Sequence, residues 1–149
     1  LFGEKKIHYD ANGAPSIEGE GFISISHSSN CCAIAICDSF KIGLDLEQRS
    51  PKAARLSSKF ITHEELEFLN PLDELEMTTS WSCKEVLYKL SGRKKIIFKE
   101  HLLLRNKEHD NWEGEIINPN EKIFVKLKTI ITQDLVITIN TSPIETVAF

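Results

Sequence analysis

The order of apolar patterns along the chain is the feature that most constrains its fold. Short apolar runs bounded by turn residues, such as 22–26 and 32–37, come first, and similar runs return after residue 95. Between them, apolar residues recur at helical spacing. Strands on both sides of a helical block favour an α+β domain with an antiparallel sheet packed with helices. The 149 residues allow one core, or one domain with a remnant of another.

The pattern predicts individual strands and helices. The strands are 6–9, 22–26, 32–37, 42–46, 96–104, 112–117, 123–131 and 135–139, and 32–37 is expected to form a hairpin with 42–46. Pro51 suits the first turn of one helix, and Thr62 with Glu65 fits a capping box that opens a second helix ending before Pro71. A third helix is expected from 74–79 to Ser91 and Gly92.

Charge and composition exclude several classes of protein. The net charge of −4 implies no dominant basic face, so we expect no nucleic-acid partner. Neither a membrane span nor a signal-peptide pattern is present in the sequence. The four cysteines lack C-x-x-C spacing, which favours small buried thiols over a zinc site and indicates the reducing cytoplasm.

Two carboxylates lie two residues apart in the predicted strand at 42–46 and just beyond it. If this segment is a strand, Asp45 and Glu47 share one face while Leu44 and Leu46 face the core. Two neighbouring carboxylates repel each other unless a cation lies between them, and Mg²⁺ prefers oxygen ligands. The alternative is a solvated acidic strand face.

The predicted third helix carries a second group of functional residues. Trp81, Glu85 and Lys89 are each four residues apart and therefore lie on one stripe. This stripe could complete a site for a cation and a phosphate. Alternatively, Glu85 and Lys89 form an exposed ion pair beside a packed Trp81, as most pairs at this spacing do.

These segments together resemble the signature of the 4′-phosphopantetheinyl transferase superfamily, in its surfactin-type branch. The resemblance covers roughly residues 10 to 100. Its motifs are Ile25-Ser-His-Ser28, Ile42-Gly-Leu-Asp-Leu-Glu47, Lys59-Phe60-x-x-x-Glu64 and Trp81-Ser-x-Lys-Glu85-x-x-x-Lys89. The segment Gly13-Ala-Pro15 resembles the family's Gly-Lys-Pro turn, with Ala14 in place of lysine.

The resemblance implies an enzyme that moves the 4′-phosphopantetheine arm of coenzyme A to a serine of an apo acyl or peptidyl carrier protein, with Mg²⁺. By this resemblance Asp45, Glu47 and Glu85 are metal ligands. Lys89 contacts the transferred phosphate, and Glu85 or Glu64 accepts the serine proton.

The resemblance also implies contacts to the phosphates of coenzyme A. His27 is the main candidate, assisted by Ser26 or Ser28, and Lys84 is a further candidate. Taken alone, a histidine at a strand end, a lysine beside a glutamate or Glu64 in a first helical turn would be an ordinary solvated group.

Surfactin-type members consist of two similar lobes with coenzyme A between them. We therefore expect residues 1–38 to be the end of a first lobe and residues 39–149 to be the C-terminal lobe. Because the first residue is Leu1 and most of a first lobe is missing, we expect a piece of a longer chain. Such a piece could be active, could need self-association, or could be a non-catalytic remnant that binds coenzyme A or a carrier protein.

Two other interpretations stay open at this point. The acidic residues could be incidental in a generic α+β domain. The segment Arg93-Lys-Lys95 could be a docking patch for a carrier protein or a solvated loop.

Overall fold

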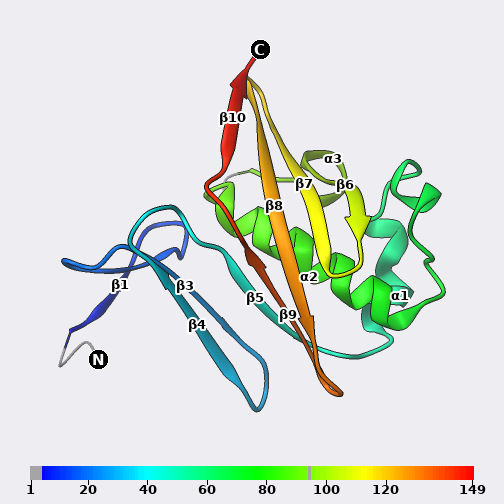
Figure 1. The fold of residues 1–149 in the computed structure, drawn as a ribbon, viewed down its shortest axis with the longest axis horizontal. Helices are drawn as coiled ribbons and strands as arrows, with labels where there is room; N and C mark the ends of the chain where they lie inside the picture. Colours follow the sequence, from blue (N-terminus) through cyan, green and yellow to red (C-terminus); the bar gives the residue numbers. More distant parts are fainter. Residues whose placement is uncertain (1–4, 94) are drawn as a thin grey trace.

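The centre of the fold is helix α2 (Glu74–Leu90), which packs against one face of an antiparallel sheet (Figure 1). The computed structural model describes residues 5–93 and 95–149. In this part of the chain the main sheet has six strands in the order β5-β9-β8-β7-β6, with β10 paired to β8. These strands are β5 (Leu44–Gln48), β6 (Leu102–Glu108), β7 (Asn111–Asn118), β8 (Glu121–Ile131), β9 (Leu135–Asn140) and β10 (Glu145–Ala148). The α+β class with an antiparallel sheet is confirmed.

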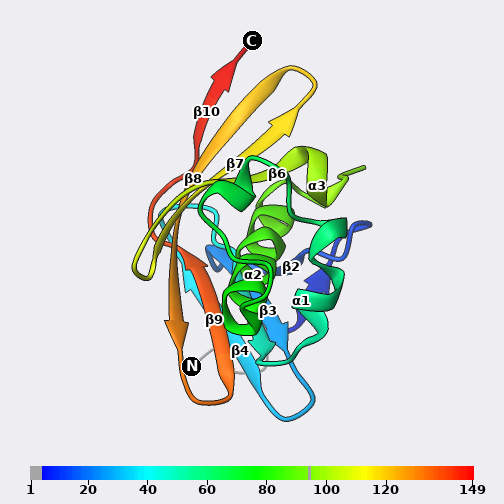
Figure 2. The ribbon, with the colours of Figure 1, turned by 90° about the vertical axis from the view of Figure 1, so that its right-hand side faces the viewer.

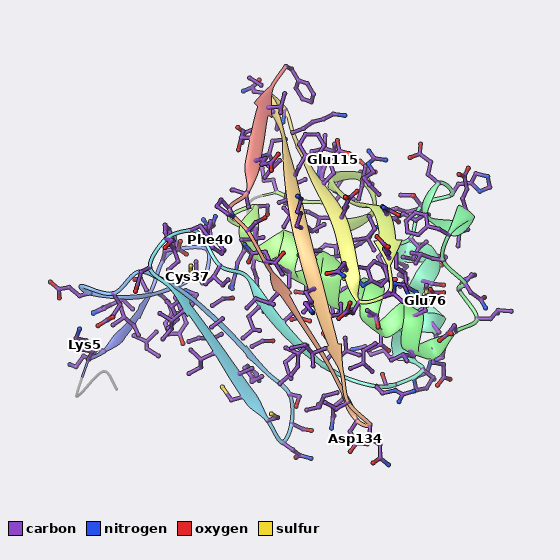
Figure 3. All side chains as sticks on the ribbon, in the orientation of Figure 1. Lys5, Cys37, Phe40, Glu76, Glu115 and Asp134 are labelled. Atoms are coloured by element: carbon purple, nitrogen blue, oxygen red, sulfur yellow. The ribbon has the colours of Figure 1, made fainter. Side chains whose placement is uncertain are left out.

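Side chains along a strand alternate between the two faces of the sheet, so only one face of the sheet packs against the helix. Along β8, Ile123, Val125 and Leu127 are buried, whereas Phe124 and Lys126 between them are exposed. Met77 and Leu87 of α2 meet the buried face and are fully inaccessible to solvent. Side chains fill the space between the helix and the sheet (Figure 3).

Helix α2 has the boundaries that its sequence predicts. The Asp73 carboxylate caps the first turn by accepting a hydrogen bond from the Glu76 backbone N–H at 3.0 Å. The helix ends at Leu90, directly before Ser91 and Gly92. Figure 2 shows the sheet on one side of α2 and helix α1 (Lys52–Leu56) on the other.

The N-terminal segment forms two small sheets beside the main one. Strand β1 (Ile7–Tyr9) pairs with β2 (Pro15–Ile17), and β3 (Phe22–His27) pairs with β4 (Cys32–Cys37). Side chains of β3 connect it to β5. Ser24 Oγ accepts a hydrogen bond from Leu44 N–H at 2.9 Å, and Ser26 Oγ accepts one from Leu46 N–H at 3.0 Å. The division at residue 38 stays a prediction.

The pairing of the early strands differs from the expected hairpin. Strand β4 pairs with β3, and β5 pairs with β9, which is distant in sequence. The Ser28 N–H donates to the Cys31 carbonyl at 2.8 Å and closes a tight β3–β4 turn. Because this local turn provides β4 with a partner, β5 is left to join the main sheet.

Two other predicted elements are also wrong. The capping box forms, because Thr62 N–H donates to Glu65 Oε2 at 2.7 Å and Glu65 N–H donates to Thr62 Oγ1 at 3.2 Å. Only a 3₁₀ turn, η2 (Glu65–Glu67), follows it instead of an α-helix. The predicted strand 96–104 begins with a short helix, α3 (Phe98–His101), before β6. The first helix is α1, which continues into the 3₁₀ turn η1 (Ser57–Lys59).

The cysteines are less buried than expected. All four are free thiols, but only Cys83 is buried, whereas Cys31 and Cys32 are exposed and Cys37 is half-buried. The exposed pair lies in and beside the β3–β4 turn, where a two-stranded sheet leaves side chains uncovered. Among the described helices, none combines the length and apolarity needed to cross a bilayer.

Candidate functional site

A cavity of about 800 Å³ lies between β3, β5, α1 and α2. It collects most of the residues that the sequence singles out. They are Ser26, His27, Ser28, Asp45, Glu47, Trp81, Glu85 and Lys89.

The two strand carboxylates face α2 across this cavity. Asp45 is 4% exposed, and its Oδ1 accepts hydrogen bonds from Ser26 Oγ at 3.2 Å and Lys89 Nζ at 3.3 Å. Glu47 Oε1 accepts from Trp81 Nε1 at 3.0 Å. Leu44 and Leu46 are buried, but they do not belong to the core cluster beneath α2. The prediction of one shared acidic face is confirmed, and that face lies towards the helix.

The helical stripe supplies the opposite wall. Trp81 stacks on Phe98 with ring centroids 5.1 Å apart, which orients its Nε1 while leaving it free to bind Glu47. Lys89 Nζ donates to the Leu44 carbonyl at 2.6 Å as well as to Asp45. Within the described residues no ion pair joins Lys89 to Glu85, so the alternative of an exposed surface pair does not fit.

The carboxylates of the cavity repel one another. Burial is the main cause that raises the pKa of Glu85 to about 7, and the charge of Asp45 is the next, while Lys89 acts in the opposite direction. Burial and then Asp45 also raise the pKa of Glu47, against the hydrogen bond from Trp81. Burial and mutual repulsion therefore disfavour the ionised forms of Glu47 and Glu85.

The donor set fits a hard divalent cation. Asp45 Oδ2 is buried and has no hydrogen-bond partner among the described residues, so one carboxylate oxygen is left without compensation. No three acidic, histidine or cysteine groups of the described chain are close enough to enclose a metal by themselves. A Mg²⁺ held by these residues would therefore take much of its oxygen shell from phosphate and water, as Mg²⁺ commonly does.

The serine and histidine residues lie at the end of β3. His27 is exposed and lines the cavity, where a ligand can reach it. Ser26 is engaged in joining β3 to β5, since its Oγ binds both Leu46 N–H and Asp45. The Oγ of Ser28 is buried without a partner in the described structure, which makes it the freer of the two hydroxyls.

The structure does not place Lys84 in the cavity. Its side chain is fully buried, where its Nζ donates to the Phe60 carbonyl and forms an ion pair with Glu65 at 2.8 Å. Glu65 also accepts from the Leu104 backbone N–H at 2.7 Å. Lys84 therefore ties α2 to η2 and β6, and we correct its expected contact with a phosphate.

Glu64 is also outside the cavity lining. Its side chain is 78% exposed, and its Oε2 accepts from Arg105 Nη1 at 3.0 Å. Because it lies outside the cavity lining and pairs with Arg105, it has no contact with the carboxylates of the cavity. The expectation that Glu64 accepts a proton is not supported by its position.

Sequence reasoning missed two features of the cavity. The sequence assigned Trp81 no specific partner, whereas in the structure its indole Nε1 donates to Glu47. Arg93 also lines the cavity, although the sequence suggested only a surface loop or a docking patch for it. Its position after the end of α2, one turn beyond Lys89, was the signal available.

Comparison with known proteins agrees with this geometry. The model of the 4′-phosphopantetheinyl transferase superfamily matches residues 41–139, which include β5, α2 and most of the main sheet. The 4′-phosphopantetheinyl transferase HetI of Nostoc sp. (strain PCC 7120) is 32% identical over 102 residues, which cover 60% of this chain and 43% of the relative. The chain thus spans less than half the length of that relative. The chain belongs to the 4′-phosphopantetheinyl transferase superfamily.

Proposed function

We propose that this protein transfers the 4′-phosphopantetheine group of coenzyme A to a serine hydroxyl of an apo acyl or peptidyl carrier protein, in a Mg²⁺-dependent reaction. The observation that carries the proposal is the convergence of Asp45, Glu47 and Glu85 with Lys89 in one cavity. Membership of the superfamily supports the reaction class, and HetI is named a 4′-phosphopantetheinyl transferase. The surfactin-type branch and the position as a C-terminal lobe belong to this proposal.

Each residue of the cavity has a proposed task. Asp45, Glu47 and Glu85 hold Mg²⁺, which when bound neutralises the diphosphate of coenzyme A. Lys89 binds the transferred phosphate, and its present hydrogen bonds to β5 hold it beside the carboxylates. His27 and Ser28 bind a further phosphate of coenzyme A, with Ser26 positioning Asp45.

The proposed chemistry is an in-line displacement at phosphorus. The serine Oγ forms a bond to the β-phosphorus of coenzyme A. The bond from that phosphorus to the bridging oxygen breaks, and its electron pair leaves with adenosine 3′,5′-diphosphate. The serine proton passes to a carboxylate that lines the cavity, and Glu85 is the proposed acceptor.

The test is the mass of the carrier. The protein is incubated with coenzyme A, Mg²⁺ and several apo carrier proteins, and each carrier is weighed by mass spectrometry. We expect a gain of one phosphopantetheine group on at least one carrier, and no gain on the same carrier with its serine changed to alanine. Glu85→Gln should abolish the gain while leaving the fold intact.

A second candidate function is a non-catalytic remnant that binds coenzyme A or a carrier protein. The match covers 43% of the length of HetI. This remnant would bind coenzyme A in a titration and leave the mass of every carrier unchanged.

A further inference from the structure

A guanidinium lies where several cavities of the molecule meet. Arg93 lines the carboxylate cavity, a second cavity of about 610 Å³, and a smaller one of about 150 Å³ beside Ala14 and Pro15. Its Nη1 donates to the Gly13 carbonyl at 2.7 Å. This bond connects the end of α2 with a turn that lies 80 residues earlier in the chain.

The guanidinium has unused hydrogen-bonding capacity. Its Nε is buried and has no hydrogen-bond partner in the described part of the chain. A guanidinium carries five N–H donors, and the contact to Gly13 uses only one of its nitrogens. Among the described residues no carboxylate lies within ion-pair distance of it. The charges of Asp10 and Glu85 act on the guanidinium from beyond that distance. A partly buried cation with free donors and no carboxylate in direct contact favours an anionic ligand.

The backbone of Arg93 also indicates a constrained position. Its φ is +61°, directly after Gly92 at +81°, so the chain leaves α2 through two left-handed residues. A non-glycine residue adopts this region at a cost, and such residues cluster at ligand sites. The bond to Gly13 contributes to holding this conformation.

Other cations of the cavity are engaged or peripheral. Lys89 already donates to Leu44 and Asp45. Lys52 lies exposed on α1. Arg93 is thus the cation best placed to bind an additional oxyanion. It contacts the turn at Gly13, where the neighbouring Ala14 is uncharged.

We propose that Arg93 binds a phosphate group of coenzyme A in the carboxylate cavity through its free guanidinium donors. This inference rests on the proposed function, because it takes coenzyme A as the ligand. Two phosphate sources within coenzyme A share this chemistry, the 3′-phosphate of the ribose and the diphosphate. A planar fork of donors suits either of them better than an ammonium does.

Calorimetric titration tests the inference without requiring turnover. Coenzyme A is titrated into wild type, Arg93→Ala, Arg93→Gln and Arg93→Lys, and into Lys95→Ala as the matched control on the same loop. We expect affinity to fall roughly tenfold or more in the alanine and glutamine variants, and by less in the lysine variant, which keeps the charge. Thermal melts of the alanine and glutamine variants separate a loss of affinity from a folding effect. Lys95→Ala should bind as wild type does.

A second ligand identifies the phosphate. If Arg93 binds the 3′-phosphate, its replacement lowers the affinity for coenzyme A but not the affinity for 3′-dephospho-coenzyme A. If it binds the diphosphate, the affinities for both ligands fall equally. Adding Ala14→Lys to Arg93→Ala should restore part of the lost affinity, since it returns a cation to the same turn.

The outcomes separate the two proposals. Unchanged affinity in folded Arg93→Ala and Arg93→Gln, with wild type binding coenzyme A, would overturn this inference and leave the proposed function standing. A wild-type protein that neither binds coenzyme A nor modifies any carrier would overturn both.

Discussion

At the scale of single residues, Glu85 is notable because its surroundings in the cavity disfavour its ionised form. Burial and the neighbouring Asp45 raise its pKa to about 7, although Lys89 favours the ionised form. At about pH 7 an ordinary glutamate is ionised, whereas Glu85 is still half-protonated. A bound cation would stabilise the ionised form of Glu85 and so offset the effects of burial and of Asp45.

This raised pKa predicts how stability depends on pH. Because the folded pKa of about 7 exceeds the reference value of 4.5, the folded state binds the proton more tightly. This contribution is fully present below pH 4.5 and is lost as pH rises to about 7. The loss amounts to about 3 kcal/mol without metal. We expect Mg²⁺ to raise the melting temperature more at about pH 8 than at about pH 5.

Calorimetric melts with and without Mg²⁺ measure this difference, and Glu85→Gln serves as the control. The variant should show a smaller pH dependence and a smaller effect of Mg²⁺. An equal effect of Mg²⁺ at both pH values in wild type would contradict the assignment of Glu85.

Adjacent glutamates provide a second prediction at this scale. Glu65 is 1% exposed and pairs with buried Lys84, whereas Glu64 is exposed and pairs with Arg105. Glu65→Gln leaves a buried ammonium without its counter-charge and should cost roughly 3 kcal/mol of unfolding free energy. Glu64→Gln, the matched control, should cost less than about 1 kcal/mol. Urea denaturation measures both, and equal costs would mean that Lys84 is not held by Glu65.

At the scale of elements, α2 approaches the sheet closely at two glycines. A Cβ at Gly43 would lie 2.9 Å from Val86 Cγ1, and a Cβ at Gly114 would lie 2.7 Å from Leu87 Cδ2. Both neighbours are fully buried, so they have little room to move. The glycines therefore set how near β5 and β7 come to the helix.

The two glycines differ in their distance along the chain from the candidate site. Gly43→Ala and Gly114→Ala should each destabilise the protein by about 1–3 kcal/mol through overpacking. Only Gly43 lies directly before Leu44 and Asp45, which bind Lys89. We expect coenzyme A affinity to fall in Gly43→Ala and to stay near wild type in Gly114→Ala. Denaturation and calorimetric titration of both variants check this, and equal affinity losses would show a general effect of stability.

At the scale of the whole molecule, the N-terminal strands stand beside the main sheet. Ser24 and Ser26 of β3 bond to β5 by side chains, and no strand ladder joins them. The family match also begins only at residue 41. The division at residue 38 stays a prediction.

A shortened chain of residues 39–149 tests that division. We expect it to unfold cooperatively, since α2 and the six-stranded sheet are retained. It should be less stable by roughly 2 kcal/mol or more, because the hydrogen bonds of Ser24, Ser26 and Ser29 to β5 and apolar contacts are lost. It should also bind coenzyme A more weakly, because His27 and Ser28 are removed. Circular dichroism with urea measures the first two effects, and a shortened chain that fails to fold would place the boundary elsewhere.

Local signals predicted the parts of the fold that depend on neighbours in sequence. The apolar spacing, Ser91 and Gly92 predicted α2, and the capping box of Thr62 and Glu65 forms as its residues indicate. The helix expected after that box does not form, and Glu65 there is engaged by Lys84 and by β6. Periodicity carries no information about such distant partners.

By itself, the sequence determined the α+β class, the helix α2, the acidic pair Asp45 and Glu47 on one strand face, and the superfamily motifs. Only the tertiary structure decided that Lys84 is a buried partner of Glu65, that Glu64 lies outside the cavity, and that Arg93 meets Gly13. The physical reason is the range of the interactions. Periodicity and caps act over a few residues, whereas burial and charge pairing depend on segments that meet only after the chain has folded.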